Sequence, residues 1–175
     1  MFEIRPFGQP SPPSSFELLR FRVARRLQGK EAAAPPPFAR YANDPVGFHR
    51  DVLGVEPWSK QRAVMESVRD HRYTAVPSCH SAGKSFSAAG LACWWIGTRP
   101  IGEAFVVSTA PTGRQVRGIL WRYVNRMHQR AGLPGRVNQT EWWIDREMVA
   151  FGAKPSEYDP SALQGIHARH VLVII

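Results

Sequence analysis

Residues 73–85 read YTAVPSCHSAGKS, a short apolar run that leads into a loop of small residues. The loop resembles the pattern G-x-x-x-x-G-K-[ST], in which backbone N–H groups cradle phosphates, the lysine reaches the β- and γ-phosphates and the last hydroxyl holds Mg²⁺. Ser78 replaces the first glycine of this pattern, whereas Gly83, Lys84 and Ser85 match it. We therefore expect a nucleoside triphosphate on this loop and Mg²⁺ on Ser85.

The segments around the loop follow the order that such a site requires. Residues 73–77 are expected to form a buried strand, and an apolar helix is expected after Lys84. His80 lies within the loop, where we interpret it as a loop-shaping or solvent-facing residue and not as a catalytic one. The residues expected to contact the nucleotide here are Ser78, Cys79, His80, Ser81, Ala82, Gly83, Lys84 and Ser85.

Composition bounds the class of protein. With 175 residues, 43% of them hydrophobic, the chain can build one packed domain. The net charge is +9, and nineteen of the 23 basic residues are arginine. This excess favours a phosphate-rich or acidic partner, although arginine also serves contacts between subunits. Cys79 and Cys93 lack metal-ligand spacing, which favours a reduced, intracellular setting, and no apolar stretch has signal-peptide or membrane-spanning length.

The chain divides into two expected parts. Residues 1–43 are predicted to be a Pro-rich, basic extension with a helix near residues 14–27, and residues 44–175 a globular α/β domain with a mainly parallel sheet. The elements expected after residue 44 are helices at 45–52, 60–68 and about 113–130, strands at 104–109 and 171–175, and a hairpin of 141–144 with 148–151.

The helix expected to end near residue 130 carries a row of arginines. Arg114, Arg122, Arg126 and Arg130 are separated by multiples of four, and no acidic residue occurs between Glu103 and Glu141. This row is either a solvated face or a surface for DNA phosphates or a neighbouring subunit.

Four segments together resemble the N-terminal ATPase domain of the large terminase subunit of tailed bacteriophages, the motor that packages DNA. The resemblance covers about residues 44–175, and its order and spacing are more specific than any single motif. The segments are Glu56-Pro57-Trp58-Ser59-Lys60-Gln61, similar to an adenine-recognition segment; the loop at 78–85; residues 108–116 after the second strand; and residues 163–168 leading into the apolar run at 171–175.

The resemblance implies a P-loop ATPase fold of the additional-strand, RecA-like type that binds ATP and Mg²⁺, with Gln61 reading the adenine. It implies coupling of ATP hydrolysis to translocation of double-stranded DNA. The implied partners are further copies in a homo-oligomeric ring, the small terminase subunit and the portal protein, with no membrane involved. The implied location is the cytoplasm of an infected bacterial host.

The sequence also departs from the family. The Asp and Glu expected at the end of the Walker B strand would follow Ile175, and the family's nuclease domain is missing. We therefore expect a sheet that is incomplete at its C-terminal end and little ATP turnover by this chain alone. Cys79 stands where some terminases carry an arginine finger, so Arg114 or Arg117 becomes the candidate finger. Lys84 and Arg114 are thus the expected catalytic residues.

The sequence also permits two other functions. A helicase-like, DNA-dependent ATPase would share Gln61 and the loop, and a non-catalytic nucleic-acid-binding module would use the arginines without ATP. His167 and His170 lack a third metal ligand nearby, so a metal site is not favoured. Trp142 and Trp143 are expected to point to opposite faces of a strand, with one of them in the core.

Overall fold

The computed structural model describes residues 35–153 and 168–175, which belong to one compact unit that spans residues 34–175. The helix expected near residues 14–27 and the segment at 163–167 lie outside the described residues. No helix in the described part of the chain is long and apolar enough to cross a membrane.

The described chain combines helices with a five-strand, partly parallel sheet, which confirms an α/β fold. The helical elements are η1 (Ala39–Tyr41), α2 (Pro45–Asp51), α3 (Ser59–Asp70), α4 (Lys84–Gly97), α5 (Gly113–Gln115), η2 (Val116–Trp121) and α6 (Arg122–Ala131). The strands are β1 (Ala104–Thr109), β2 (Arg136–Asn138), β3 (Glu141–Ile144), β4 (Glu147–Ala153) and β5 (His170–Ile174). The helices predicted at 45–52 and 60–68 and the strand at 104–109 are confirmed within one or two residues.

The five strands form one mixed sheet in the order β2-β3-β4-β1-β5. β1 pairs in parallel with β4 and with β5, whereas β3 pairs antiparallel with β2 and with β4. The expectation of a mainly parallel sheet is therefore wrong for half of the pairings. The physical reason for the antiparallel pairings lies between residues 136 and 153. Two-residue turns that begin at Gln139 and Asp145, both with positive φ, join each strand directly to its antiparallel neighbour.

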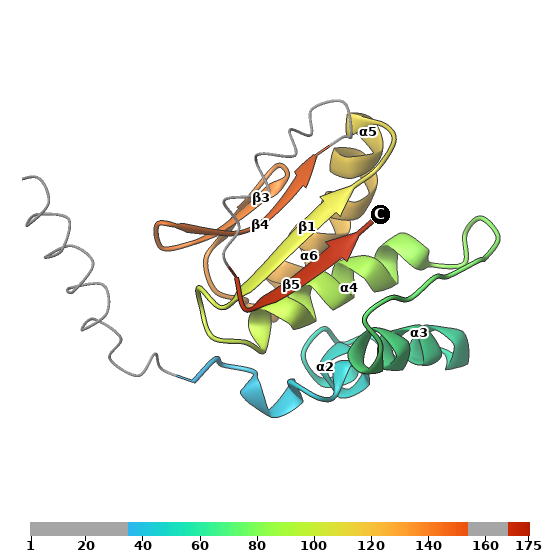
Figure 1. The fold of residues 1–175 in the computed structure, drawn as a ribbon, viewed down its shortest axis with the longest axis horizontal. Helices are drawn as coiled ribbons and strands as arrows, with labels where there is room; N and C mark the ends of the chain where they lie inside the picture. Colours follow the sequence, from blue (N-terminus) through green and yellow to red (C-terminus); the bar gives the residue numbers. More distant parts are fainter. Residues whose placement is uncertain (1–34, 154–167) are drawn as a thin grey trace, which may run out of the picture. The chain divides into compact units, whose positions relative to one another are not determined.

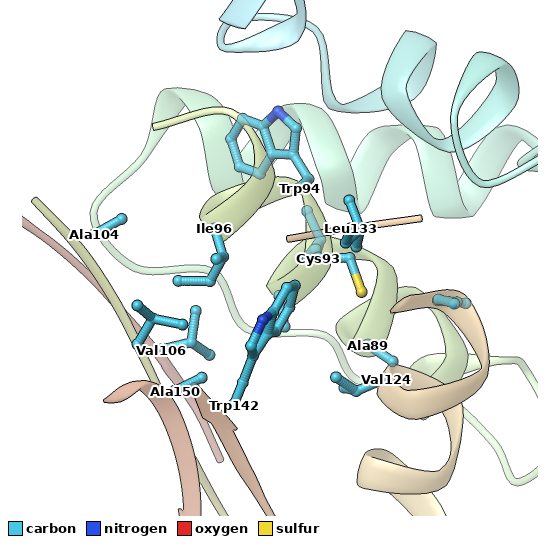
Figure 2. Close-up of a cluster of buried hydrophobic side chains, with 14 of the residues drawn as sticks. Ala89, Cys93, Trp94, Ile96, Ala104, Val106, Val124, Leu133, Trp142 and Ala150 are labelled. Atoms are coloured by element: carbon cyan, nitrogen blue, oxygen red, sulfur yellow. The ribbon is translucent and has the colours of Figure 1, made fainter. Parts of the chain in front are cut away.

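α4 and α6 pack together against one face of the sheet (Figure 1). The core between them includes Trp142, which is completely buried and donates its indole N–H to the Pro134 carbonyl at 2.9 Å. Figure 2 shows the Trp142 ring extending from the sheet toward α4. The neighbouring Trp143 instead donates to the Glu141 carboxylate. One tryptophan of this pair is in the core, as the alternation of a strand predicts.

The strand predicted at residues 73–77 is absent, and this segment is irregular and largely exposed. Tyr73 has an exposed fraction of 81%. A strand exists through hydrogen bonds to a neighbour, and no described strand pairs with this segment. β5 is present as expected. The apolar run at residues 171–175 is typical of a buried strand, but β5 is an edge strand with Val171 and Val173 exposed, so that interpretation is wrong.

The helix expected to end near Arg130 runs from residue 113 to residue 131, but its middle part, η2, is a π-helix. Inside this turn Trp121 is buried and donates its indole N–H to Ser108 of β1 at 2.9 Å. Gly152 of β4 leaves room for the same indole, because a Cβ there would overlap Trp121. The wide turn is thus held against the sheet, and π-turns of this kind are frequent at functional sites.

α2 approaches α4 closely at Gly90. A Cβ at Gly90 would overlap the ring of His49, which is completely buried and has no room to move. Gly90→Ala is expected to lower the free energy of unfolding by about 2 kcal/mol, the usual cost of overpacking. Denaturant-induced unfolding measures the change.

Gly118→Ala is the matched control, because a Cβ at Gly118 meets no atom within 4 Å. Its free energy of unfolding is expected to stay the same or to rise by up to about 1 kcal/mol through helix propensity. Equal stability of the two variants would contradict the tight contact at Gly90.

Candidate functional site

The loop before α4 places a set of backbone N–H groups at the end of a buried helix. Ser81 and Gly83 have φ of 62° and 81°, which turns the chain sharply into Lys84, the first residue of α4. The first helical hydrogen bond runs from the Ser87 N–H to the Gly83 carbonyl at 2.9 Å. The N–H groups that precede it therefore have no partner within the helix, and they form the positive end of the helix dipole.

Lys84 folds back over this loop. Its Nζ donates to the Ser78 carbonyl at 3.1 Å and to the Cys79 carbonyl at 2.7 Å, while the side chain stays exposed. Lys84 thus keeps the loop curved and holds a positive charge above it. An anion that reaches the loop would meet the ammonium group and the free N–H groups together.

Gln61 and the loop lie side by side. The Gln61 Oε1 accepts a hydrogen bond from the Trp58 backbone N–H at 3.2 Å, which closes the N-terminus of α3. A Cβ at Gly83 would lie 2.9 Å from the Gln61 Nε2. Gln61 and Gly83, more than twenty positions apart in the sequence, are therefore in contact. A nucleotide that touches both Gln61 and the loop requires this proximity.

A groove with a volume of 740 Å³ begins at the loop and passes between α3, α4 and β5. Of the residues expected to bind nucleotide, Gln61, Ser78, Cys79, Ala82 and Lys84 line it, together with Thr74–Pro77 and residues 172–175. Ser85 is partly buried on the first turn of α4 and does not line the groove, and His80 and Ser81 are exposed. Four of the eight loop residues at 78–85 thus line the groove, and Gly83 is not among them.

The loop lies at the end of the sheet where the parallel strands finish. In Figure 1 the N-terminus of α4 is on the same side as the arrowheads of β1 and β5, and α5 follows β1 there. Ligands of open α/β sheets bind outside the carboxyl ends of the strands. Arg114 on α5 and Arg117 on η2 are exposed near this end and make no ion pair with a described acidic residue.

The arginines of α6 form an exposed basic surface. Arg122, Arg126 and Arg130 are exposed, and within the described residues the ion pairs involve other arginines, namely Arg50, Arg62, Arg69 and Arg169. The opposite side of α6 buries Val124 and Met127 in the core. The row of arginines therefore faces solvent from a helix whose other face is fixed.

The sequence patterns did not single out Trp58, which lines the groove, or His49, which packs against α4. His49 of α2 donates from Nδ1 to the Pro45 carbonyl at 2.7 Å, and its Nε2 and the buried Ser87 Oγ of α4 have no hydrogen-bond partner. Burial lowers the pKa of His49. Trp58 is half exposed at the edge of the groove. Its position beside Gln61 in the adenine-like segment was a usable signal, whereas the burial of His49 depends on tertiary packing.

The described residues contain no group of three His, Cys, Asp or Glu side chains placed to hold a metal ion. His170 lies on β5, and His167 lies outside the described residues. Comparisons of the chain with family models, with curated proteins and with solved structures found no match.

The lowered pKa of His49 predicts a pH-dependent stability. Above the ordinary pKa of about 6.5, His49 is neutral in the folded and unfolded chains, and its contribution to stability is fully present. Below this pH the unfolded chain takes up a proton that the buried ring resists, so the free energy of unfolding is expected to fall. Unfolding measured at about pH 7.5 and about pH 5.5 tests this in the wild type and in His49→Asn, whose amide keeps a donor for Pro45.

His71 offers a matched control. It makes the same contact with the carbonyl four residues earlier, Ser67 at 3.2 Å, but from an exposed position. His49→Asn is expected to reduce the loss of stability toward acid, whereas His71→Asn keeps it. An unchanged pH dependence in His49→Asn would contradict the assignment.

Proposed function

We propose that this chain is the ATP-binding part of a terminase-like DNA-packaging motor. The observation that carries the proposal is the loop of residues 78–83 at the N-terminus of α4, with Lys84 folded over it and Gln61 in contact with Gly83. The resemblance of four ordered segments to the large terminase subunit gives this geometry its specific interpretation. The position of the loop beside the carboxyl ends of β1 and β5 supports it.

The residues at the loop fit a triphosphate. Unpaired N–H groups at the start of α4 would hold phosphate oxygens, Lys84 would neutralise charge on the β- and γ-phosphates, and the Ser85 hydroxyl would hold Mg²⁺. Bound Mg²⁺ neutralises phosphate charge and favours transfer of the terminal phosphoryl group. The Gln61 carboxamide, which offers a donor and an acceptor, would read the adenine edge. Arg114 is the candidate finger, from its own subunit or for a neighbouring one.

The proposal includes a P-loop ATPase fold of the additional-strand, RecA-like type. In this fold another strand lies beside the Walker B strand. In the resemblance β5 corresponds to the Walker B strand. Its outer side is the edge of the sheet, and residues 172–175 line the groove. An open edge next to an apolar groove supports this arrangement, because exposed edges of this kind invite pairing.

The basic surface of α6 supports double-stranded DNA as the substrate. Three exposed arginines separated by four residues can neutralise backbone phosphates without reading sequence. The core side of α6 packs against α4, which begins at the loop. α4 therefore connects the expected DNA surface on α6 to the expected nucleotide site at the loop.

Loss of the Lys84 charge is expected to weaken ATP binding. Lys84→Ala removes the cation above the loop, and a charge-assisted contact of this kind corresponds to at least about a tenfold loss of affinity. Titration calorimetry with ATP measures the change.

Lys60→Ala is the control, because Lys60 lines the same groove from α3 and carries the same charge. Its affinity for ATP is expected to stay within about threefold of the wild type, since Lys60 is exposed, makes no hydrogen bond to the loop and contributes little through charge alone. ATP affinity that is unchanged in Lys84→Ala would refute the assignment of the loop.

Removal of two α6 arginines is expected to weaken binding to duplex DNA. The double variant Arg122→Ala, Arg126→Ala should reduce the slope of log affinity against log salt by about 2, because each neutralised phosphate contributes about 0.9. Fluorescence anisotropy at several salt concentrations measures this slope.

The double variant Arg50→Ala, Arg69→Ala is the control for net charge, because both arginines are exposed and each is paired with the aspartate that follows it. It should leave the slope unchanged. DNA affinity that is indifferent to these arginines would remove α6 as the DNA surface. Intact, salt-sensitive DNA binding in a chain that binds no ATP would instead support the non-catalytic module.

A further inference from the structure

Trp58 differs from every other tryptophan of the chain. Its side chain has an exposed fraction of 52%, whereas the other five are buried or partly buried. Each of those five donates its indole N–H to a protein acceptor. The Trp58 indole has no acceptor within the described residues, and its large apolar surface is left in water, which is unfavourable. Trp58 is therefore the tryptophan whose ring is available to a ligand.

The backbone holds Trp58 in a defined place. Its N–H donates to the Gln61 side chain at 3.2 Å, so the indole and the carboxamide belong to the same first turn of α3. Gln61 in turn reaches Gly83 of the loop. An aromatic face, an amide and the loop thus follow one another along one side of the groove, which both Trp58 and Gln61 line.

We propose that Trp58 stacks on the base of the nucleotide whose phosphates lie on the loop. This inference rests on the proposed function and adds to it the residue that binds the base. Stacking on an aromatic side chain is available to every base, whereas a carboxamide distinguishes one base edge from another. Trp58 therefore contributes affinity for a purine, and Gln61 contributes the choice of adenine. The groove volume of 740 Å³ is in the range of small-molecule sites.

The experiment compares ATP with inorganic tripolyphosphate, which has the phosphates but no base. Trp58→Ala is expected to weaken ATP binding about tenfold, as alanine substitution of a stacking residue does, and to leave tripolyphosphate binding unchanged. Trp58→Phe keeps an aromatic face and should bind ATP within about threefold of the wild type. Trp58→Leu keeps apolar area without a π-face and should behave like Trp58→Ala. Titration calorimetry on the whole chain measures all affinities.

Trp143→Ala is the matched control, because Trp143 is a partly buried tryptophan of β3 that does not line the groove. Its affinities for both ligands should equal those of the wild type. Thermal unfolding of each variant confirms that the domain is intact.

The outcomes separate this inference from the proposed function. Equal ATP affinity in Trp58→Ala and the wild type, with a loss in Lys84→Ala, overturns stacking and leaves the nucleotide site in place. An equal loss for ATP and tripolyphosphate in Trp58→Ala also overturns it, because the effect then acts on the loop and not on the base. Absence of binding by both ligands, or indifference of both to Lys84→Ala, refutes the proposed function and this inference together.

Discussion

The burial of α4 is the constraint on which the rest of the structure depends. Nine of its fourteen residues are buried, and many are Ala, Gly or Cys, which let neighbouring elements approach closely. Gly90 admits the ring of His49 from α2, and Gly97 meets Leu133, Phe38 and Phe48. On the sheet side, the indole of Trp95 donates to the carbonyl of His170 in β5 at 3.3 Å. These contacts, which lie between Gly90 and Gly97, fix the direction of α4.

Because α4 is fixed, the loop at its N-terminus is fixed as well. A loop of small residues has little packing of its own, and its position is inherited from the helix that follows it. Gln61 reaches the loop only because α3 also packs beside α4. The candidate site is therefore a product of helix packing, although the residues of its loop are contiguous in the sequence.

Elements with strong local signals could be predicted from the sequence. Asp44 caps α2 by accepting from the Gly47 N–H at 2.8 Å, which the Asp-Pro pair indicates, and the turn at Asp145 with its flanking strands was expected. The segment at 73–77 was wrongly predicted, because a strand depends on a partner that local pattern does not reveal. Of the antiparallel pairings, that of β3 with β4 was predicted as a hairpin, whereas that of β2 with β3 was missed. The order of the strands in the sheet is a long-range property that a local pattern does not reveal.

The candidate site was predictable to a similar degree. The loop residues were recognised from a contiguous pattern, and Gln61 was connected with them through a family resemblance. The burial of His49 follows from tertiary packing and carries no local signature, whereas Trp58 lies in the same segment as Gln61 and could have been found through it. The π-helical turn of η2, held by Trp121 against Ser108, likewise could not be read from an apolar period that fits an ordinary helix.

The two hydrogen bonds of Lys84 have a further consequence. Because its ammonium group bridges the carbonyls of Ser78 and Cys79, a side chain of the protein itself holds the curvature of the loop. An anion bound here would exchange hydrogen bonds of one ammonium group and would not need to order a segment of chain. The conformational entropy of ordering the loop is lost during folding, so the loop would be preorganised for an anion.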